Sequence, residues 1–287
     1  MSSGTLLEPT WGALLAEGRR RLSGEENAPY EAEELLARAA ARPRAWFLGR
    51  RAEPADASSR AAFETLVARR AAGEPLQYLL GEWEFLGRTF RVDPRALIPR
   101  LETVGIVEAA RAAAPGARAL ADLGTGSGIL AVTLALERPE ARVLAIDRSP
   151  AALALAAENA RRHGVSSRVR AVASDWLSAF APRPLFDLAV ANPPYVSVAD
   201  APHLSKTVSD FEPPLALYGG GDGLEAIRAL LAGLVDFLRP GAPFVFEFGY
   251  GQARDVSGLV EASGTFRLVD IRLDTAGIPR TATTLRL

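Results

Sequence analysis

The strongest chemical signal in this chain is the tetrapeptide Asn192-Pro193-Pro194-Tyr195. It follows an apolar run over residues 185–191 that predicts a buried parallel strand, and open α/β sheets bind ligands at the carboxyl ends of such strands. Two consecutive prolines remove two backbone donors and fix φ, so the Asn192 amide and the Asn192 and Pro193 carbonyls form a rigid set of acceptors. Such a set suits a planar NH2 group, and the Tyr195 ring adds a flat face for stacking. By itself the tetrapeptide is equally an ordinary exit from a strand into a loop.

A glycine-rich turn lies upstream, between a predicted strand and a predicted helix. Residues 119–121 are apolar, the turn runs from Asp122 to Gly128, and the apolar run 129–136 follows. Glycines allow positive φ and close approach of a ligand, while a helix N-terminus offers unpaired N–H groups. Asp147 ends the next apolar strand, about 20 residues further on, where an acidic side chain can accept hydrogen bonds from both ribose hydroxyls. These positions predict a nucleoside site.

The spacing of the glycines separates two classes of cofactor. Gly126, Gly128 and Ala131 can be placed in the G-x-G-x-x-G/A pattern of dinucleotide-binding proteins, but that placement starts the pattern too far into the helix. The register Gly124, Gly126 and Gly128, directly after Asp122, gives G-x-G-x-G. In this register the sequence resembles the class I methyltransferases that bind S-adenosylmethionine.

This resemblance implies a cofactor role for the end of each strand. In that family the glycine turn passes the methionine part of the cofactor, and the acid at the position of Asp147 holds the ribose. A third predicted strand, residues 168–173, precedes Asp175 and Trp176, which would accept from the adenine amino group and pack on the adenine ring. The implied cofactor-binding residues are Asp122, Gly124, Thr125, Gly126, Ser127, Gly128, Asp147, Asp175, Trp176 and Asn192. For Asp122, a structural role at the strand end is an equal alternative.

Composition and charge restrict the class of protein. The chain has 287 residues, of which 48% are hydrophobic and 23% charged, enough for a two-domain enzyme with a sizeable core. A net charge of -1 offers no broad basic surface for a nucleic-acid backbone. Because there is no Cys and the two His are His163 and His203, we expect neither a metal site nor a disulfide. We find no signal segment and no membrane-spanning apolar window, and therefore expect a cytoplasmic protein with no membrane partner.

The spacing of apolar residues changes near residue 80, from a helical pattern to a strand-like one. Helical spacing of apolar residues at 9–22, 30–41 and 57–72 predicts a small helical bundle, and the alternation over residues 81–92 around a Leu-Gly turn predicts a β-hairpin. Residues 1–85 hold 11 Arg against 13 Asp and Glu, and this mildly acidic balance argues against a nucleic-acid clamp. We expect three parts: the bundle at residues 1–80, the hairpin linker at residues 81–104 and an α/β domain at residues 105–287.

The segment between the hairpin and the α/β domain indicates a more specific family within the class I methyltransferases. Residues 96–103, together with residues 74–78 and the tetrapeptide at 192–195, are similar to the protein-(glutamine-N5) methyltransferases that modify peptide chain release factors. The similarity continues at residues 211–213, 219–224, 247–252 and 274–277 and so covers nearly the whole chain. It departs at Leu101, where the family usually has proline. The resemblance implies an enzyme whose bundle recognises class I release factors and whose substrate is the glutamine of their Gly-Gly-Gln motif. For the bundle, a stabilising cap or a dimerisation module is an equal alternative. We expect the enzyme to be a monomer.

The implied substrate sets the chemistry. A glutamine amide nitrogen is a poor nucleophile because its lone pair is delocalised, so positioning must supply the rate. If the Asn192 side-chain oxygen and the Pro193 carbonyl accept the two amide hydrogens, the nitrogen faces the sulfonium methyl and both bonds strengthen in the transition state. We therefore expect Asn192, Pro193 and Tyr195 to be catalytic. Pro194 and Leu97 would complete the substrate site, although core packing is the favoured alternative for Leu97.

Three other functions stay open. A nucleic-acid methyltransferase acting on adenine N6 or guanine N2 faces the same planar NH2 group, but it must capture a base and usually carries an electropositive surface. A glutamine methyltransferase acting on a ribosomal protein would share every catalytic motif. A noncatalytic cofactor-binding module is disfavoured because the site motifs are intact.

For the α/β domain we expect a Rossmann-like, seven-stranded, mostly parallel and doubly wound sheet. The expected helices lie near residues 105–114, 128–138, 150–163 and 223–238, and the final strands near residues 265–273 and 281–287, where the resemblance implies an antiparallel strand. The stretch 197–223, rich in Pro, Gly, Asp and Ser, predicts a long flexible lid over the substrate.

Overall fold

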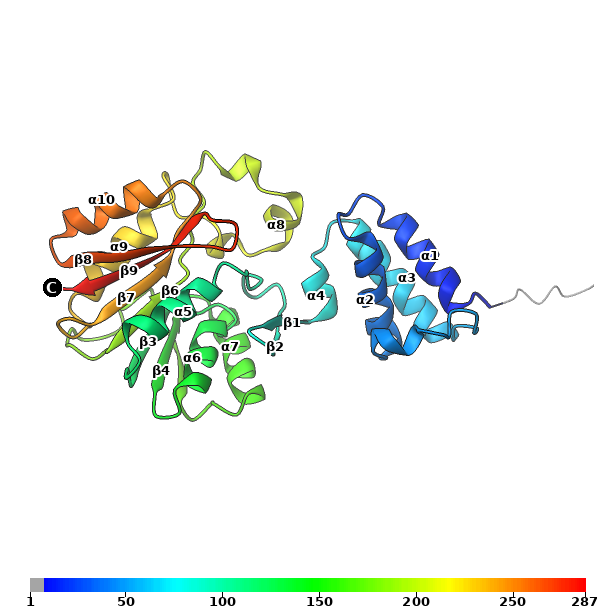
Figure 1. Ribbon diagram of the computed structural model, residues 1–287, viewed down its shortest axis with the longest axis horizontal. Coiled ribbons are helices and arrows are strands. Elements are labelled where there is room, and N and C mark those ends of the chain that lie inside the picture. The colour runs from blue at the N-terminus through cyan, green and yellow to red at the C-terminus, as the bar shows by residue number, and fades with distance from the viewer. Residues whose placement is uncertain (1–7) are drawn as a thin grey trace, which may run out of the picture. The chain divides into compact units, whose positions relative to one another are not determined.

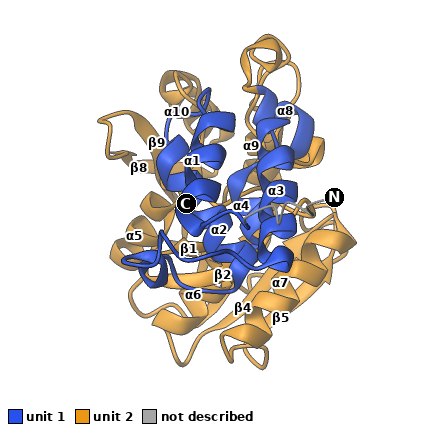
Figure 2. Ribbon diagram, turned by 90° about the vertical axis from the view of Figure 1, so that its right-hand side faces the viewer, with its two compact units in different colours: residues 1–82, 206–211 blue, residues 83–205, 212–287 orange. Residues whose placement is uncertain are grey.

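The computed structural model describes residues 8–287, which divide into two compact units. Unit 1 comprises the chain up to Glu82 together with Lys206–Phe211, and unit 2 comprises Trp83–Ser205 and Glu212–Leu287. Figure 2 shows unit 1 in blue and unit 2 in orange. Residues 1–7, which the predicted bundle includes, lie outside the described part of the chain.

Unit 1 is a helical bundle around its own apolar core. Its helices are α1 (Trp11–Arg21), α2 (Ala28–Ala40), the 3-10 helix η1 (Arg44–Phe47), α3 (Ala57–Ala71), α4 (Leu76–Leu80) and α8 (Lys206–Phe211). Helix α1 begins where the Thr10 hydroxyl accepts a hydrogen bond from the Ala13 N–H. Helix α3 begins in the same way at Asp56, whose carboxylate accepts from the Ser59 N–H, because both side chains satisfy a free donor of the first turn. The three helices predicted in this part of the sequence are confirmed.

The predicted hairpin is present as β1 (Glu82–Phe85) and β2 (Arg88–Arg91). Its turn places Leu86 at φ 49° and Gly87 at φ 72°. Positive φ at both central residues is the type I′ arrangement, whose twist matches that of two antiparallel strands. The chain can therefore reverse within two residues.

Unit 2 contains the predicted seven-stranded sheet (Figure 1). Its strands are β3 (Ala119–Leu123), β4 (Arg142–Asp147), β5 (Val169–Ala173), β6 (Leu188–Ala191), β7 (Pro243–Glu247), β8 (Phe266–Leu273) and β9 (Pro279–Arg286). Within residues 8–287 the strand order is β5-β4-β3-β6-β7-β9-β8, and β9 is antiparallel to both of its neighbours. The direction of winding reverses between β3 and β6. Open α/β sheets bind their ligands at such a switch point.

Helices cover both faces of this sheet (Figure 1). Helices α5 (Val104–Ala113), α6 (Ile129–Glu137) and α7 (Pro150–Arg162) contribute apolar side chains to one core, and α9 (Glu225–Leu234) and α10 (Ala253–Ser263) to a second core. Strand β3 divides its side chains between the two cores, with Leu120 in the first and Ala121 in the second. The doubly wound arrangement is confirmed. No helix among residues 8–287 is both long and apolar enough to cross a membrane.

The structure differs from the predictions at two elements of unit 2. Strand β6 begins at Leu188, because the Asp187 carboxylate accepts hydrogen bonds from the N–H groups of Arg118 and Ala119, while the Leu185 N–H donates to the Phe237 carbonyl. Helix α10 was not predicted. The spacing of its buried Val256 and Val260, four residues apart on one face, was the available signal.

The stretch 197–223 is not the irregular loop that its composition predicts. It contains two 3-10 helices, η2 (Ala201–His203) and η3 (Pro214–Ala216), as well as α8. Within unit 1, a Cβ at Gly73 would lie 3.6 Å from the Phe211 ring, so the end of α8 has an apolar contact. Within unit 2, Glu212 is buried and its carboxylate accepts a hydrogen bond from the Ile98 N–H at 3.0 Å. These contacts explain the local order; a role of the stretch as a lid stays a prediction.

Candidate active site

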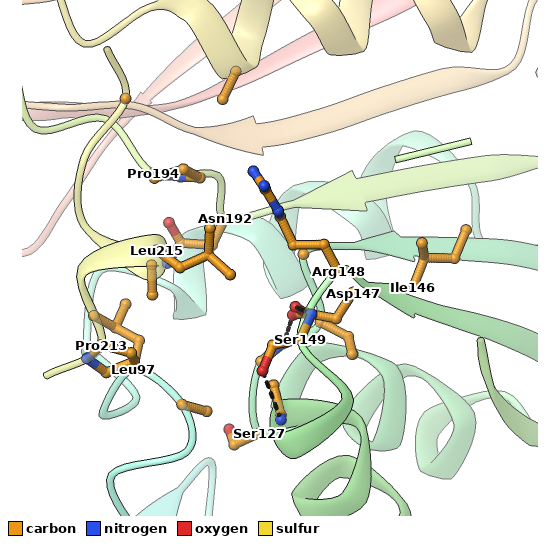
Figure 3. A pocket seen from close by; sticks show the side chains of 18 of the residues that line it. Leu97, Ser127, Ile146, Asp147, Arg148, Ser149, Asn192, Pro194, Pro213 and Leu215 are labelled. Carbon is orange, nitrogen blue, oxygen red and sulfur yellow. Dashed lines mark hydrogen bonds between the residues drawn. The ribbon is translucent and has the colours of Figure 1, made fainter. Parts of the chain in front are cut away.

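A cavity of about 730 Å³ opens at the carboxyl ends of β3, β4 and β6 (Figure 3). It lies beside the switch point of the sheet, as expected for this architecture. The predicted site residues that line it are Leu97, Gly124, Thr125, Gly126, Ser127, Asp147, Asp175, Trp176, Asn192 and Pro194. Within the described residues, the lining does not include Asp122, Gly128, Pro193 or Tyr195. No group of three or more His, Asp or Glu side chains in residues 8–287 could hold a metal ion.

The glycine turn needs its glycines for two different reasons. Gly124, Gly126 and Gly128 have φ of 74°, 54° and 79°, in the left-handed region that side chains rarely adopt. Gly124 and Gly126 leave the main chain open to the cavity. A Cβ at Gly128 would instead lie 2.8 Å from the Ala156 Cβ, so this glycine allows the start of α6 to pack against α7. Gly128 therefore shapes the turn from outside the cavity.

Asp122 lies behind the turn and not in the cavity. Its Oδ2 accepts hydrogen bonds from the Thr125 hydroxyl at 2.6 Å and from the Ala131 N–H at 3.0 Å. The side chain is fully buried, and Oδ1 has no hydrogen-bond partner within the part of the chain that the structure describes. Burial raises the pKa of Asp122 to about 7. The geometry favours the structural alternative: Asp122 ties the turn to the first turn of α6.

Asp147 presents its carboxylate to the cavity from the end of β4 (Figure 3). Oδ2 accepts from the Gly126 N–H at 2.9 Å, and Oδ1 accepts from the Ser149 N–H at 2.9 Å. These two bonds fix the plane of the carboxylate. Because a carboxylate oxygen can accept more than one hydrogen bond, both oxygens retain capacity for a pair of neighbouring hydroxyls.

Asp175 and Trp176 line the cavity after β5. Trp176 has φ 49°, an uncommon conformation for a residue other than glycine. A Cβ at Gly124 would lie 3.6 Å from the Trp176 ring, so the glycine turn and the indole are close neighbours. The half-buried indole therefore provides a flat apolar surface next to the turn, with the exposed Asp175 beside it.

Asn192 belongs to a chain of hydrogen bonds that the sequence did not reveal. Its Nδ2 donates to the Thr103 hydroxyl at 3.0 Å, and this hydroxyl donates to Glu247 Oε2 at 2.9 Å. The Tyr195 hydroxyl donates to Glu247 Oε1 at 3.1 Å. The hydroxyl of Tyr195 thus points to Glu247, which the prediction of a stacking role did not anticipate. Thr103 and Glu247 were missed as site residues, although both stand in segments that carry the family resemblance.

Burial governs the protonation of the groups in this chain of hydrogen bonds. Glu247 is fully buried, and desolvation raises its pKa to about 7 against the opposing effect of the Thr103 and Tyr195 hydrogen bonds. Burial and the nearby Glu247 carboxyl also raise the pKa of Tyr195. Tyr195 therefore keeps its proton and remains a hydrogen-bond donor at neutral pH.

Leu97 lines the cavity from the segment before Pro99 (Figure 3). Its neighbours Ala96 and Ile98 are buried, whereas Leu97 itself is only partly buried. Glu212 anchors this segment by accepting the Ile98 N–H and pairing with Arg100. The structure therefore places Leu97 in the wall of the cavity, although core packing was the favoured alternative.

Two family models match this chain, one in its N-terminal part and one in its α/β domain. The family model described as "PrmC N-terminal domain" matches residues 13–81, and the one described as "Methyltransferase small domain" matches residues 106–207. A release factor glutamine methyltransferase of Cereibacter sphaeroides is 46% identical over 250 residues, which cover 87% of this chain and 88% of the relative. A release factor glutamine methyltransferase of Nitratidesulfovibrio vulgaris is 41% identical over 287 residues, which cover 98% of this chain and 96% of the relative.

The chain belongs to the release factor glutamine methyltransferase family. It is therefore a methyltransferase, as its motifs imply. A solved methyltransferase from Pyrococcus furiosus matches with a TM-score of 0.53 and 18% identity, covering 70% of this chain and 90% of that one. This match shows the class I methyltransferase fold.

Methyltransferases of this family use S-adenosylmethionine, and the residues of the cavity fit that cofactor. The glycine turn exposes its main chain where a flat or extended ligand can approach closely. Asp147 offers a fixed pair of acceptors for the ribose hydroxyls, and Trp176 offers a flat apolar face for the adenine. These three features lie around one cavity, next to Asn192, so a methyl donor bound there would lie beside the predicted substrate site.

Proposed function

We propose that this enzyme transfers the methyl group of S-adenosylmethionine to the side-chain amide nitrogen of glutamine in the Gly-Gly-Gln motif of class I peptide chain release factors. The observation that carries the proposal is the orientation of Asn192 in the wall of the cavity. Since its Nδ2 donates to Thr103, its Oδ1 is left to accept a hydrogen from another group. A primary amide presents such a hydrogen.

In the proposed reaction the protein acts by positioning. The bound cofactor supplies an electrophilic methyl group on a sulfonium. Asn192 Oδ1 and the Pro193 carbonyl would accept the two hydrogens of the glutamine NH2 and hold its nitrogen toward that methyl group. As positive charge develops on the nitrogen, both hydrogen bonds strengthen, so they stabilise the transition state more than the ground state. The proton leaves the nitrogen after methyl transfer, when the nitrogen is acidic.

The remaining site residues divide between substrate and cofactor. Pro194 and Leu97, both in the wall of the cavity, would restrict the glutamine side chain and exclude water. Tyr195 would support the substrate site through its partly buried ring and its bond to Glu247. The proposed cofactor contacts are Gly124, Thr125, Gly126, Ser127, Asp147, Asp175 and Trp176, with Asp122 and Gly128 shaping the turn.

We extend the proposal to the parts of the chain. The helical bundle, residues 1–80, recognises the release factor; the hairpin segment, residues 81–104, links it to the methyltransferase domain, residues 105–287. The match of residues 13–81 to the PrmC N-terminal domain supports a family-specific role for the bundle. The enzyme acts as a monomer in the cytoplasm, where translation terminates, and requires no nucleic acid.

The experiment is methylation of a purified class I release factor with labelled S-adenosylmethionine, followed by mass spectrometry of the peptide that contains Gly-Gly-Gln. We expect label on the glutamine side chain, and none when that glutamine is replaced by alanine. Label on a ribosomal protein, or on adenine or guanine of added RNA, with an unlabelled release factor would contradict the proposal.

A further inference from the structure

Thr103 stands at the beginning of α5, where a threonine hydroxyl normally caps the helix by accepting a free N–H of the first turn. Within the described residues, no such side-chain bond forms at this N-cap. The hydroxyl instead accepts from Asn192 Nδ2 and donates to Glu247 Oε2. Helix α5 therefore begins without the usual side-chain cap, and the hydroxyl serves the end of β6.

The donors and acceptors of Thr103 and Glu247 determine which end of the Asn192 amide faces Thr103. When Glu247 is ionised, its carboxylate only accepts hydrogen bonds, so the single hydroxyl proton of Thr103 is directed to Glu247. Thr103 can then offer Asn192 only lone pairs. The NH2 end of the Asn192 amide must face Thr103, and its oxygen must face the other way. This conclusion follows from donors and acceptors and does not depend on telling amide nitrogen from oxygen by shape.

The carboxylate that directs this arrangement is itself held. Glu247 ends β7, which pairs in parallel with β6, so its side chain lies at the same edge of the sheet as Asn192. Oε1 accepts from the Tyr195 hydroxyl while Oε2 accepts from Thr103. With one donor on each oxygen and no exposed surface, the carboxylate has little freedom to rotate.

We propose that Thr103 and Glu247 are positioning residues for methyl transfer, which hold the Asn192 amide with its oxygen toward the substrate. The proposal rests on the proposed function, because it takes a primary amide as the nucleophile. A flipped Asn192 amide has almost the same shape but would present NH2 to the substrate NH2. Two donors cannot hydrogen-bond to each other, so the flipped form would leave the substrate nitrogen without its acceptor.

The decisive variant is Thr103→Val, which keeps the branched shape and removes the hydroxyl. We expect kcat on a purified class I release factor to fall by about 10- to 100-fold, the effect of losing one oriented hydrogen bond in the transition state. The Kd for S-adenosylmethionine, measured by calorimetry, should stay within about twofold, because the proposed ribose and adenine contacts are untouched. Thr103→Ser, which restores the hydroxyl, should recover most of kcat.

Thr133→Val is the matched control. Thr133 is a buried threonine of α6 whose hydroxyl has no hydrogen-bond partner within residues 8–287. Its loss should leave kcat unchanged. If Thr103→Val proves unfolded by circular dichroism, Thr103→Ala replaces it, since the smaller side chain also removes the hydroxyl and cannot crowd its neighbours.

A double variant separates positioning from a direct role of Thr103. If Thr103 acts through Asn192, the hydroxyl has nothing left to orient in Asn192→Ala, and adding Thr103→Val should not lower the residual activity further. An equal fractional loss in both backgrounds would overturn the proposal, as would wild-type kcat in the folded Thr103 variant. Failure of the wild type to methylate glutamine would overturn the proposed function and this inference together, whereas wild-type activity with an unaffected Thr103 variant overturns the inference alone.

Discussion

The Glu212 carboxylate accepts a hydrogen bond from the Ile98 N–H at 3.0 Å, across 114 residues of sequence. This bond and the ion pair with Arg100 hold the segment whose Leu97 side chain lines the cavity. The segment between the hairpin and α5 thus keeps its place through a residue that follows β6, and the wall of the cavity depends on both.

Replacing Glu212 should loosen that wall. We expect Glu212→Ala to raise the KM for the release factor several-fold and to lower the free energy of unfolding by about 1–3 kcal/mol, because the Ile98 N–H loses its partner in a buried place. Steady-state kinetics and denaturant unfolding measure the two effects. Glu140→Ala, at an exposed glutamate before β4, is the control. An unchanged KM would show that the segment does not need this anchor.

Asn192→Ala should abolish most turnover while leaving S-adenosylmethionine binding nearly intact. Asn192 lines the cavity and, in the proposed reaction, accepts a hydrogen of the nucleophile, whereas the proposed cofactor contacts come chiefly from other residues. Calorimetric titration of the cofactor beside the kinetic assay checks this. Parallel losses of affinity and activity would instead assign Asn192 chiefly to the cofactor.

Asp147→Ala should have the opposite effect. The two carboxylate oxygens are fixed by the Gly126 and Ser149 N–H groups and face the cavity. Their loss should weaken cofactor binding by about 1–3 kcal/mol, as for hydrogen-bonded groups deprived of a partner. Asp236→Ala, at an exposed position after α9, should bind normally. Unchanged affinity in Asp147→Ala would remove Asp147 from the ribose site.

Two glycine variants test the packing of the turn. Gly128→Ala combines φ of 79° with a Cβ 2.8 Å from the Ala156 Cβ, and should destabilise the fold by about 1–3 kcal/mol. Gly233→Ala, inside α9 and with open space around the added Cβ, should stabilise it by roughly 0.5–1 kcal/mol. Thermal unfolding compares them. Equal behaviour of the two variants would contradict the close packing of α6 on α7.

Stability should fall as pH rises from about 4 to about 7. Burial raises the folded-state pKa of Asp122 and of Glu247 to about 7 from ordinary values of 3.8 and 4.5. In this window the folded protein therefore binds more protons than the unfolded chain, and each added pH unit disfavours folding. The contribution is fully present below about pH 4 and lost above about pH 7.

Asp122→Asn isolates one of these contributions. The asparagine oxygen can still accept from Thr125 and Ala131, but it does not titrate. Urea unfolding at several pH values should show a shallower fall in stability for the variant than for the wild type. An identical slope would mean that Asp122 titrates in its ordinary range.

The sequence by itself determined most of the strands and helices, with α8 and α10 as exceptions, together with the glycine turn and the position of Asn192 at the end of a strand. These features depend on local causes: apolar periodicity, the conformational freedom of Gly124 and Gly126, and the restriction of φ in Pro193. These local causes do not predict the features that depend on contacts between distant residues. One such feature is the start of β6, which lies after Asp187 because the Asp187 carboxylate bonds to the N–H groups of Arg118 and Ala119.

Only the tertiary structure decided how the candidate site is supported. Thr103 and Glu247 are 144 residues apart in sequence, and the bond between them forms because β6 and β7 are neighbours at the edge where α5 begins. The same sheet order turned the Tyr195 hydroxyl toward Glu247, a direction that no pattern of residue types contains. Residue types and local spacing show which groups can react. Strand order and burial fix which of those groups meet, because they bring together side chains from distant parts of the chain.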